Sequence, residues 1–167
     1  IHTCISTIFK SNLDTLDFLG MGMSLPIDFF VKSTGRDHGN KNVLLQLPLP
    51  SSKSLLVDSL RVRSLVLNCL TDYYAEFWSS CWRDCYRFEN FSKIDTRLDK
   101  DFFNNLSSSW ERGHTARTDY LRRQILLEID VIVAQMLGLS FDELLTLYKV
   151  QFPVMQFYEN NTWYDQK

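Results

Sequence analysis

The sequence predicts a mainly α-helical α+β fold, in which a small mixed N-terminal part with short strands precedes a helical C-terminal part. Three observations favour this fold. The first ten residues alternate loosely and are rich in Ile, Thr and Phe, glycines and prolines then interrupt the chain repeatedly, and apolar residues recur with helical period from Lys53 onward. We place the boundary between residues 1–50 and 51–167 and expect one compact fragment, since 167 residues suit a single domain.

The N-terminal part begins with a predicted strand over residues 1–10, because β-branched and aromatic residues are typical of strands. Ser11 or Asn12 is then predicted to cap a helical segment over residues 13–19. Gly20 and Gly22 are expected to interrupt the chain after this segment.

A second helix is predicted over residues 24–32, since Pro26 is tolerated only in the first turn of a helix. Gly35 is a plausible residue to end it. A polar turn and a short apolar strand over residues 43–47 complete this part, before two prolines that form a connector.

The helical part is predicted to open with a helix from Lys53 to Phe77 or Trp82. Residues 86–114 carry short polar pieces between aromatic residues. We therefore expect a long loop there, with one or two short helices and aromatic anchors.

The clearest helix is predicted from Thr118 to Leu137, where seven apolar residues form one face and Gly138 comes next as a stop. The sequence Ser140-Phe141-Asp142-Glu143 is a capping box and predicts that Ser140 begins another helix, which reaches about Val150. Pro153 is expected to end that helix.

The charge is unevenly distributed along the chain. The net charge is −2, from 18 basic and 20 acidic residues, but residues 32–63 hold six basic and two acidic residues. This local excess favours one electropositive face. The alternative is a solvated surface with an ordinary local fluctuation of charge.

The four cysteines, at positions 4, 69, 81 and 85, match no disulfide scaffold, and no second close Cys/His pair completes a zinc site. Reduced cysteines in a cytoplasmic protein fit best. The sequence holds no run of about 18 apolar residues and no signal peptide, so we expect no membrane segment. The start at Ile1 and the close at Thr162–Lys167 predict a piece of a longer protein.

Motifs for catalysis are not found. The sequence holds no phosphate-binding GxxxxGK[ST] loop, no GxGxxG after a strand and no GxSxG elbow, and its three histidines lack metal-ligand spacing. We therefore predict no catalytic, cofactor-binding or metal-binding residue, although a free-standing enzyme with an unrecognised pocket stays open as an alternative.

The turn from Lys32 to Asn42, called the 32–42 turn below, holds most of the functional signal. Lysine and arginine contact phosphates, arginine and asparagine read base edges, and glycine allows close backbone approach. The candidate DNA-binding residues are Lys32, Arg36, His38, Asn40 and Lys41. The alternative is an ordinary surface turn, in which His38 and Asn40 bond the turn's own backbone.

Several pieces together resemble one family. They include the helix Ser24–Lys32, the Gly35-x-x-His38-x-Asn40 turn and the segment Gln46-Leu47-Pro48. Later pieces occur in matching order: Arg122-Arg123, Leu127-Glu128-Ile129-Asp130, Leu137-Gly138-Leu139-Ser140, Phe152-Pro153-Val154, Tyr158-Glu159 and Thr162-Trp163-Tyr164-Asp165. The order is similar to the C-terminal part of large class I S-adenosylmethionine-dependent DNA adenine methyltransferases. These enzymes serve type IIG and IIL restriction-modification and phage-defence systems. The resemblance covers nearly the whole chain except about residues 83–110.

The resemblance implies a non-catalytic C-terminal fragment that helps to recognise a double-stranded DNA target or supports the recognition region. The family's Asn/Asp-Pro-Pro-Tyr/Phe motif and its Gly-containing cofactor loop are not in this sequence. S-adenosylmethionine is therefore expected for the parent enzyme and not for the fragment, whose partner would be the rest of the methyltransferase chain. The rival hypothesis is a helical protein-interaction module that docks a partner subunit without touching DNA.

Overall fold

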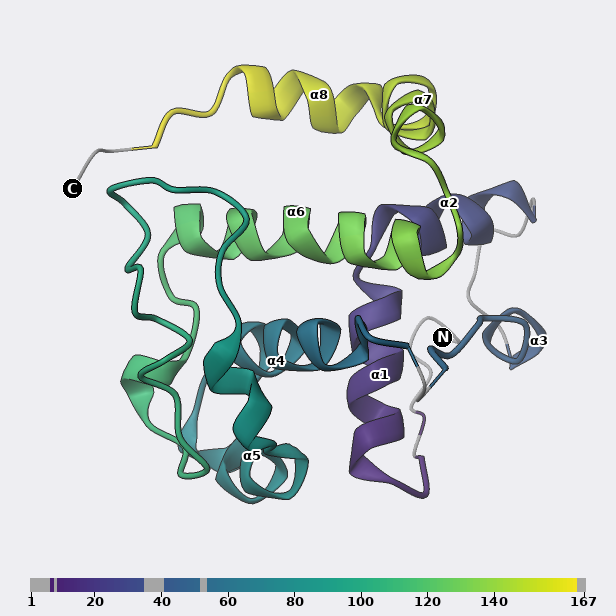
Figure 1. Cartoon of the computed structure of the whole chain (residues 1–167). Helices are drawn as coiled ribbons and strands as arrows, with labels where there is room; N and C mark the ends of the chain where they lie inside the picture. Colours follow the sequence, from purple (N-terminus) through teal and green to yellow (C-terminus); the bar gives the residue numbers. More distant parts are fainter. Residues whose placement is uncertain (1–6, 8, 35–40, 52–53, 165–167) are drawn as a thin grey trace.

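The computed structural model describes residue 7 and residues 9–34, 41–51 and 54–164, and this part of the chain is built from helices (Figure 1). The α-helices are α1 Asn12–Gly22, α2 Leu25–Ser33, α3 Lys41–Leu44, α4 Val57–Asn68, α5 Ala75–Cys81, α6 Asp119–Met136, α7 Phe141–Gln151 and α8 Pro153–Asn160. Short 3-10 helices are η1 Asp72–Tyr74, η2 Asp84–Phe88 and η3 Arg112–His114.

Helix α4 lies at the centre of the molecule, alongside α6 and crossed by α1 (Figure 1). Every residue from Val57 to Leu67 except Asp58 and Ser59 is buried. A helix that is buried nearly all round must be covered by other elements on each side. Helices α7 and α8 form an outer layer over α2 and α6. The hydrophobic core joins residues from both predicted parts, including Leu16, Ile27, Leu65 and Ile129.

The mainly helical prediction is confirmed, whereas the predicted short strands are not seen in the described part of the chain. Residues 43–47 form the end of α3 and a following turn, in which Gln46 N–H donates to the carbonyl of Val43. An apolar run of this length fits a strand or a buried helical turn equally well, and here Val43 is fully buried. Residues 1–6 and 8 lie outside the described residues.

Gly20 does not interrupt α1, contrary to the sequence prediction. It lies inside the helix and faces α4, where a Cβ atom would stand 2.5 Å from Ser64 Oγ and 2.7 Å from Leu60 Cγ. The glycine therefore serves close helix packing rather than a chain break. The predicted cap is confirmed, because the Ser11 hydroxyl accepts from Leu13 N–H.

The predicted helix from Lys53 to Phe77 or Trp82 is divided. Helix α4 ends at Asn68, and the chain continues through η1 into α5. Side chains from residues 110–122 bond the carbonyls at the end of α4: Arg122 reaches Leu67, Trp110 reaches Cys69, and Arg117 reaches Leu70. Because these donors come from a distant segment, the apolar period alone did not reveal the break.

Two arginines of α4 are buried in ion pairs. Arg61 holds Asp17 of α1 through two bonds, from Nε to Oδ1 and from Nη2 to Oδ2, each 2.6 Å long. Both side chains are only 7% exposed. The bond to Asp17 raises the pKa of Arg61 despite the opposing effect of burial. A two-pronged Arg–carboxylate pair fixes both distance and direction, so it sets how α1 crosses α4.

Arg63 is the second buried cation, and it joins α4 to α6. Its Nε donates to Glu128 at 2.8 Å, and its Nη1 donates to Glu89 at 2.7 Å. The other oxygen of Glu128 accepts from Ser92 N–H and Gln124 Nε2. Burial alone would raise the pKa of Glu128, but the Arg63 charge and these bonds outweigh burial and lower it.

The long loop predicted for residues 86–114 is confirmed as mostly irregular structure between η2 and η3. Its aromatic anchors are Phe91, Phe102 and Phe103, whose ring centroids lie 4.9 to 5.8 Å apart. The Arg63 guanidinium lies over the Phe103 ring, 5.1 Å from its centroid. The loop is therefore held by aromatic packing and by the same buried arginine that holds α6.

The predicted helix from Thr118 to Leu137 is confirmed as α6, with Thr118 as its N-cap. Gly138 comes next with φ of +76°, Gly138 N–H donates to Gln135, and Leu139 N–H donates to Ala134. These bonds form a Schellman turn, which requires the left-handed conformation that glycine adopts readily. Ser140 and Glu143 then form the predicted capping box of α7. Pro153 lies just beyond the end of α7 and opens α8, which the sequence pattern did not predict.

Replacing Ser140 by alanine is expected to lower the free energy of unfolding by about 1 kcal/mol, because Glu143 N–H loses its side-chain acceptor. Urea unfolding measures the change. Ser108→Ala, at an exposed serine outside the helices, is the matched control. Equal stability of Ser140→Ala and the control would show that the capping box contributes nothing.

Candidate nucleic-acid interface

The 32–42 turn is entered from α2 and left through α3. At the end of α2, the Thr34 hydroxyl donates to the carbonyl of Val31 at 2.7 Å. Val43 in α3 is fully buried. The two described ends of the turn are therefore attached to the helical body.

Asp130 of α6 holds the start of α2. Its carboxylate accepts from Leu25 N–H at 2.8 Å, although the two residues are 105 positions apart. The N-cap Ser24 does not take this role, because its hydroxyl donates to the carbonyl of Met21 instead. A carboxylate at a helix N-terminus satisfies a free N–H and interacts favourably with the helix dipole. Asp130 thus connects α6 to the helix that leads into the 32–42 turn.

Glu128 and Asp130 are two residues apart on α6, so their side chains point in different directions, and each has its own partner. Glu128 faces Arg63 and Asp130 faces Leu25. The sequence spacing separates the two acids, but it contains no signal for the partner of either one. Burial raises the pKa of Asp130 to about 6, and Glu159 adds to this shift, whereas the Leu25 N–H bond and the Arg123 charge oppose it.

Lys32 is the candidate residue whose side chain the structure describes. Its Nζ donates to Asp28 at 2.8 Å, one helical turn away. It also lies 4.3 Å from the centroid of the Phe152 ring. Lys32 is therefore attached to α2 and to the start of α8 while its side chain stays 45% exposed.

The structure does not describe the side chains of the other four candidate residues. Arg36, His38 and Asn40 lie outside the described residues, and Lys41 is the first residue of α3. Their contact with DNA therefore stays a prediction.

The predicted electropositive face is wrong for two of its six basic residues. Arg61 and Arg63 are buried, at 6% and 4% exposure, and each faces a carboxylate. Local charge counts assume that charged side chains lie at the surface, which is the usual case. Here these two arginines neutralise Asp17 and Glu128 in the interior.

A second surface feature lies on the outer layer. Helices α7 and α8 contain no buried residue, yet this layer and the segment after it expose large apolar side chains: Phe141, Val150, Val154, Phe157, Tyr158 and Trp163. Exposed apolar groups that gather on one layer are typical of interaction surfaces.

No three His, Cys, Asp or Glu side chains among the residues that the structure describes are grouped so that they could hold a metal ion. Within the same residues, none of the helices combines the length and apolar character needed to cross a bilayer.

Comparison with protein-family models, with curated proteins and with solved structures finds no match to this chain.

The raised pKa of Asp130 predicts a specific pH dependence of stability. The folded carboxyl titrates near 6 and its ordinary value is 3.8, so the folded protein binds an extra proton between these values. The contribution of Asp130 to the free energy of unfolding therefore falls as pH rises through this window, by up to about 3 kcal/mol. Asp130→Asn keeps an oxygen for Leu25 N–H and removes this dependence. Relative to wild type, the variant should gain stability from pH 4 to pH 7.

Urea unfolding of both proteins across this range checks the expectation, and Asp101→Asn removes an exposed carboxylate as the control. A wild-type to Asp130→Asn difference that stays constant with pH would contradict it.

Proposed function

We propose that this chain is a non-catalytic part of a cytoplasmic DNA adenine methyltransferase of the restriction-modification class. Its helical body supports the 32–42 turn, and this turn contacts double-stranded DNA. The parent chain supplies the S-adenosylmethionine site and the methyl-transfer motif. Such enzymes must extrude the target base from the duplex, which requires a firm grip on the surrounding DNA.

The observation that carries the proposal is the bond from Leu25 N–H to Asp130. It joins two of the segments on which the resemblance depends, the helix before the 32–42 turn and the Leu127–Asp130 segment of α6. Such a bond is what a supporting element needs, because it transmits the rigidity of α6 to the helix that presents the turn.

The other segments of the resemblance occupy joints of the helical body. Leu137–Ser140 is the junction of α6 and α7, and Phe152–Val154 is the junction of α7 and α8, where Phe152 is buried. The Tyr158-Glu159 pair contributes a carboxylate that pairs with Arg123 and accepts from Tyr148. A supporting role explains why these segments are structural and carry no reactive group.

The experiment uses the full-length parent with Arg36→Ala and Lys41→Ala, and measures duplex affinity at several salt concentrations. Each variant is expected to weaken binding to all sequences and to reduce the slope of log affinity against log salt by about one unit, because one phosphate contact is lost. Lys100→Ala, at an exposed lysine of the long loop, is the control and should bind as wild type does. Wild-type binding by both turn variants across the salt range would overturn the DNA contact.

A second candidate function rests on the apolar side chains of α7 and α8. The chain would then be a helical interaction module that docks a partner subunit, and Phe157 and Tyr158, at 63% and 64% exposure, would lie in the interface. Paired substitution of these two residues by serine would then abolish partner binding, and Arg36→Ala and Lys41→Ala would leave duplex affinity unchanged. Under the first proposal, by contrast, substitutions in the 32–42 turn weaken duplex binding and reduce its salt dependence.

A further inference from the structure

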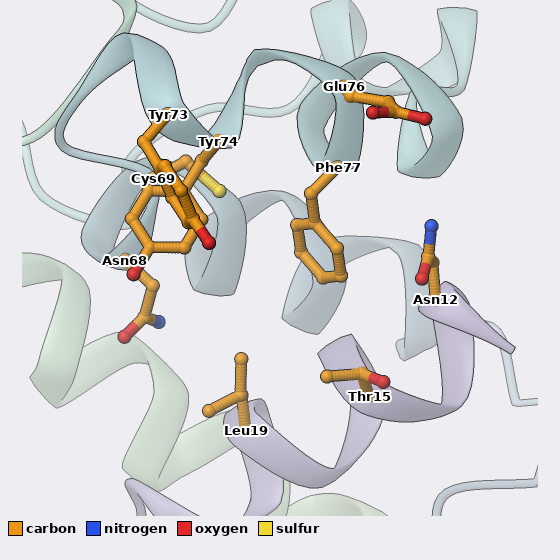
Figure 2. A pocket seen from close by; sticks show the side chains of 9 residues that line it. All are labelled: Asn12, Thr15, Leu19, Asn68, Cys69, Tyr73, Tyr74, Glu76 and Phe77. Atoms are coloured by element: carbon orange, nitrogen blue, oxygen red, sulfur yellow. The ribbon is translucent and has the colours of Figure 1, made fainter. Parts of the chain in front are cut away.

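A groove of about 650 Å³ lies between α1 and the segment formed by η1 and α5 (Figure 2). Side chains from α1 form one side, and side chains from η1 and α5 form the other. The tyrosines stand at one end, Glu76 and Asn12 stand at the other, and the Phe77 ring projects between them.

Aromatic rings form much of the wall. Tyr73 and Tyr74 meet edge to face, with ring centroids 5.2 Å apart and planes at 86°. Tyr73 is 85% exposed and Tyr74 is 42% exposed, so both rings are accessible to a ligand. The face of an aromatic ring attracts cations and guanidinium planes.

The polar groups of the groove are suited to accept hydrogen bonds. Asn12 uses its NH₂ group on Ser80, at 2.7 Å, and Asn68 uses its NH₂ group on the carbonyl of Ser64, at 2.8 Å. The second N–H of Asn68 donates to Met23 Sδ, so Asn68 retains its amide oxygen for a ligand, whereas Asn12 retains its amide oxygen and one N–H. Glu76, which is exposed, is the charged residue among those that line the groove.

The groove is suited to binding and not to nucleophilic chemistry. Its thiol belongs to Cys69, which is buried, and desolvation raises the pKa of this thiol to about 12. The thiolate is the reactive form, so Cys69 is inert at neutral pH. A phosphate ligand is disfavoured, because Glu76 and the neighbouring exposed Asp72 would repel it.

We propose that this groove binds the side chain of an arginine that a partner polypeptide presents. The guanidinium is planar, so it can donate paired hydrogen bonds to Glu76 at one end of the groove and stack on the adjoining Phe77 ring, while the flanking peptide reaches the tyrosines at the other end. The volume is larger than one side chain needs, which leaves room for the flanking peptide. Charge complementarity and the aromatic walls together select arginine over a neutral side chain.

The test is a titration of the 167-residue protein with the blocked tripeptide acetyl-Gly-Arg-Gly-amide, monitored by NMR of the amide and Tyr signals. Saturable shifts confined to residues around the groove are expected. The same peptide with citrulline, which has the shape of arginine without its charge, should bind at least about tenfold more weakly. The lysine peptide should bind about threefold more weakly, since its ammonium neither stacks nor forms paired bonds.

Two exposed positions allow substitution without disturbing the core. Glu76→Gln and Tyr73→Leu should each weaken the arginine peptide about fivefold. The matched controls, Glu111→Gln and Phe88→Leu, change exposed residues that do not line the groove and should leave affinity unchanged.

Equal binding of the arginine and citrulline peptides, wild-type affinity of Glu76→Gln, or shifts that map away from the groove would each overturn the proposal. Lysine binding as tight as arginine binding would overturn the assignment to a guanidinium.

Discussion

Two arginines inside the buried helix α4 determine how the other long helices are arranged. Arg61 holds α1 through Asp17, and Arg63 holds α6 through Glu128 and the long loop through Glu89 and Asn90. A buried charge without a partner is strongly destabilising, so each carboxylate must return to its arginine whenever the chain folds. The ion pairs therefore specify one arrangement of helices that apolar packing alone would leave less defined. Gly20 permits this arrangement, because a Cβ atom at this position would clash with Ser64 and Leu60.

The helical arrangement has a consequence for the 32–42 turn. Glu128 and Asp130 lie two residues apart on α6, and they face α4 and α2 respectively. The same helix is thus fixed to the core and fixes the start of α2. In our proposal α2 then presents the turn to DNA, and the rigidity of the turn's base derives from a buried ion pair on the opposite side of α6. Most of the chain therefore has a supporting role in this proposal.

Local signals in the sequence were sufficient where a helix boundary is a local event. The ends of α6 and the start of α7 depend on Thr118, Gly138 and Ser140, and all three bond within a few residues, so the sequence predicts them well. The break after α4 depends on Trp110, Arg117 and Arg122, which act across more than 40 residues and leave no periodic signature. The candidate functional features divide in the same way, into those with a local sequence signal and those that depend on distant contacts. The composition of the 32–42 turn is visible in the sequence, whereas the burial of Arg61 and Arg63, the role of Asp130 and the groove beside Tyr73 arise only from tertiary contacts.

The organising role of the buried ion pairs is tested most directly by a double-mutant cycle on Asp17 and Arg61, with the free energy of unfolding measured in urea. Arg61→Met leaves the Asp17 carboxylate buried without its partner, and Asp17→Leu leaves Arg61 with only the longer contact to Asp58, at 3.7 Å. Each should cost about 3–5 kcal/mol. The double variant removes both charges and should be much more stable than the sum of the single losses predicts. Single losses below about 1 kcal/mol, or losses that simply add in the double variant, would contradict the claim that this buried pair organises the fold.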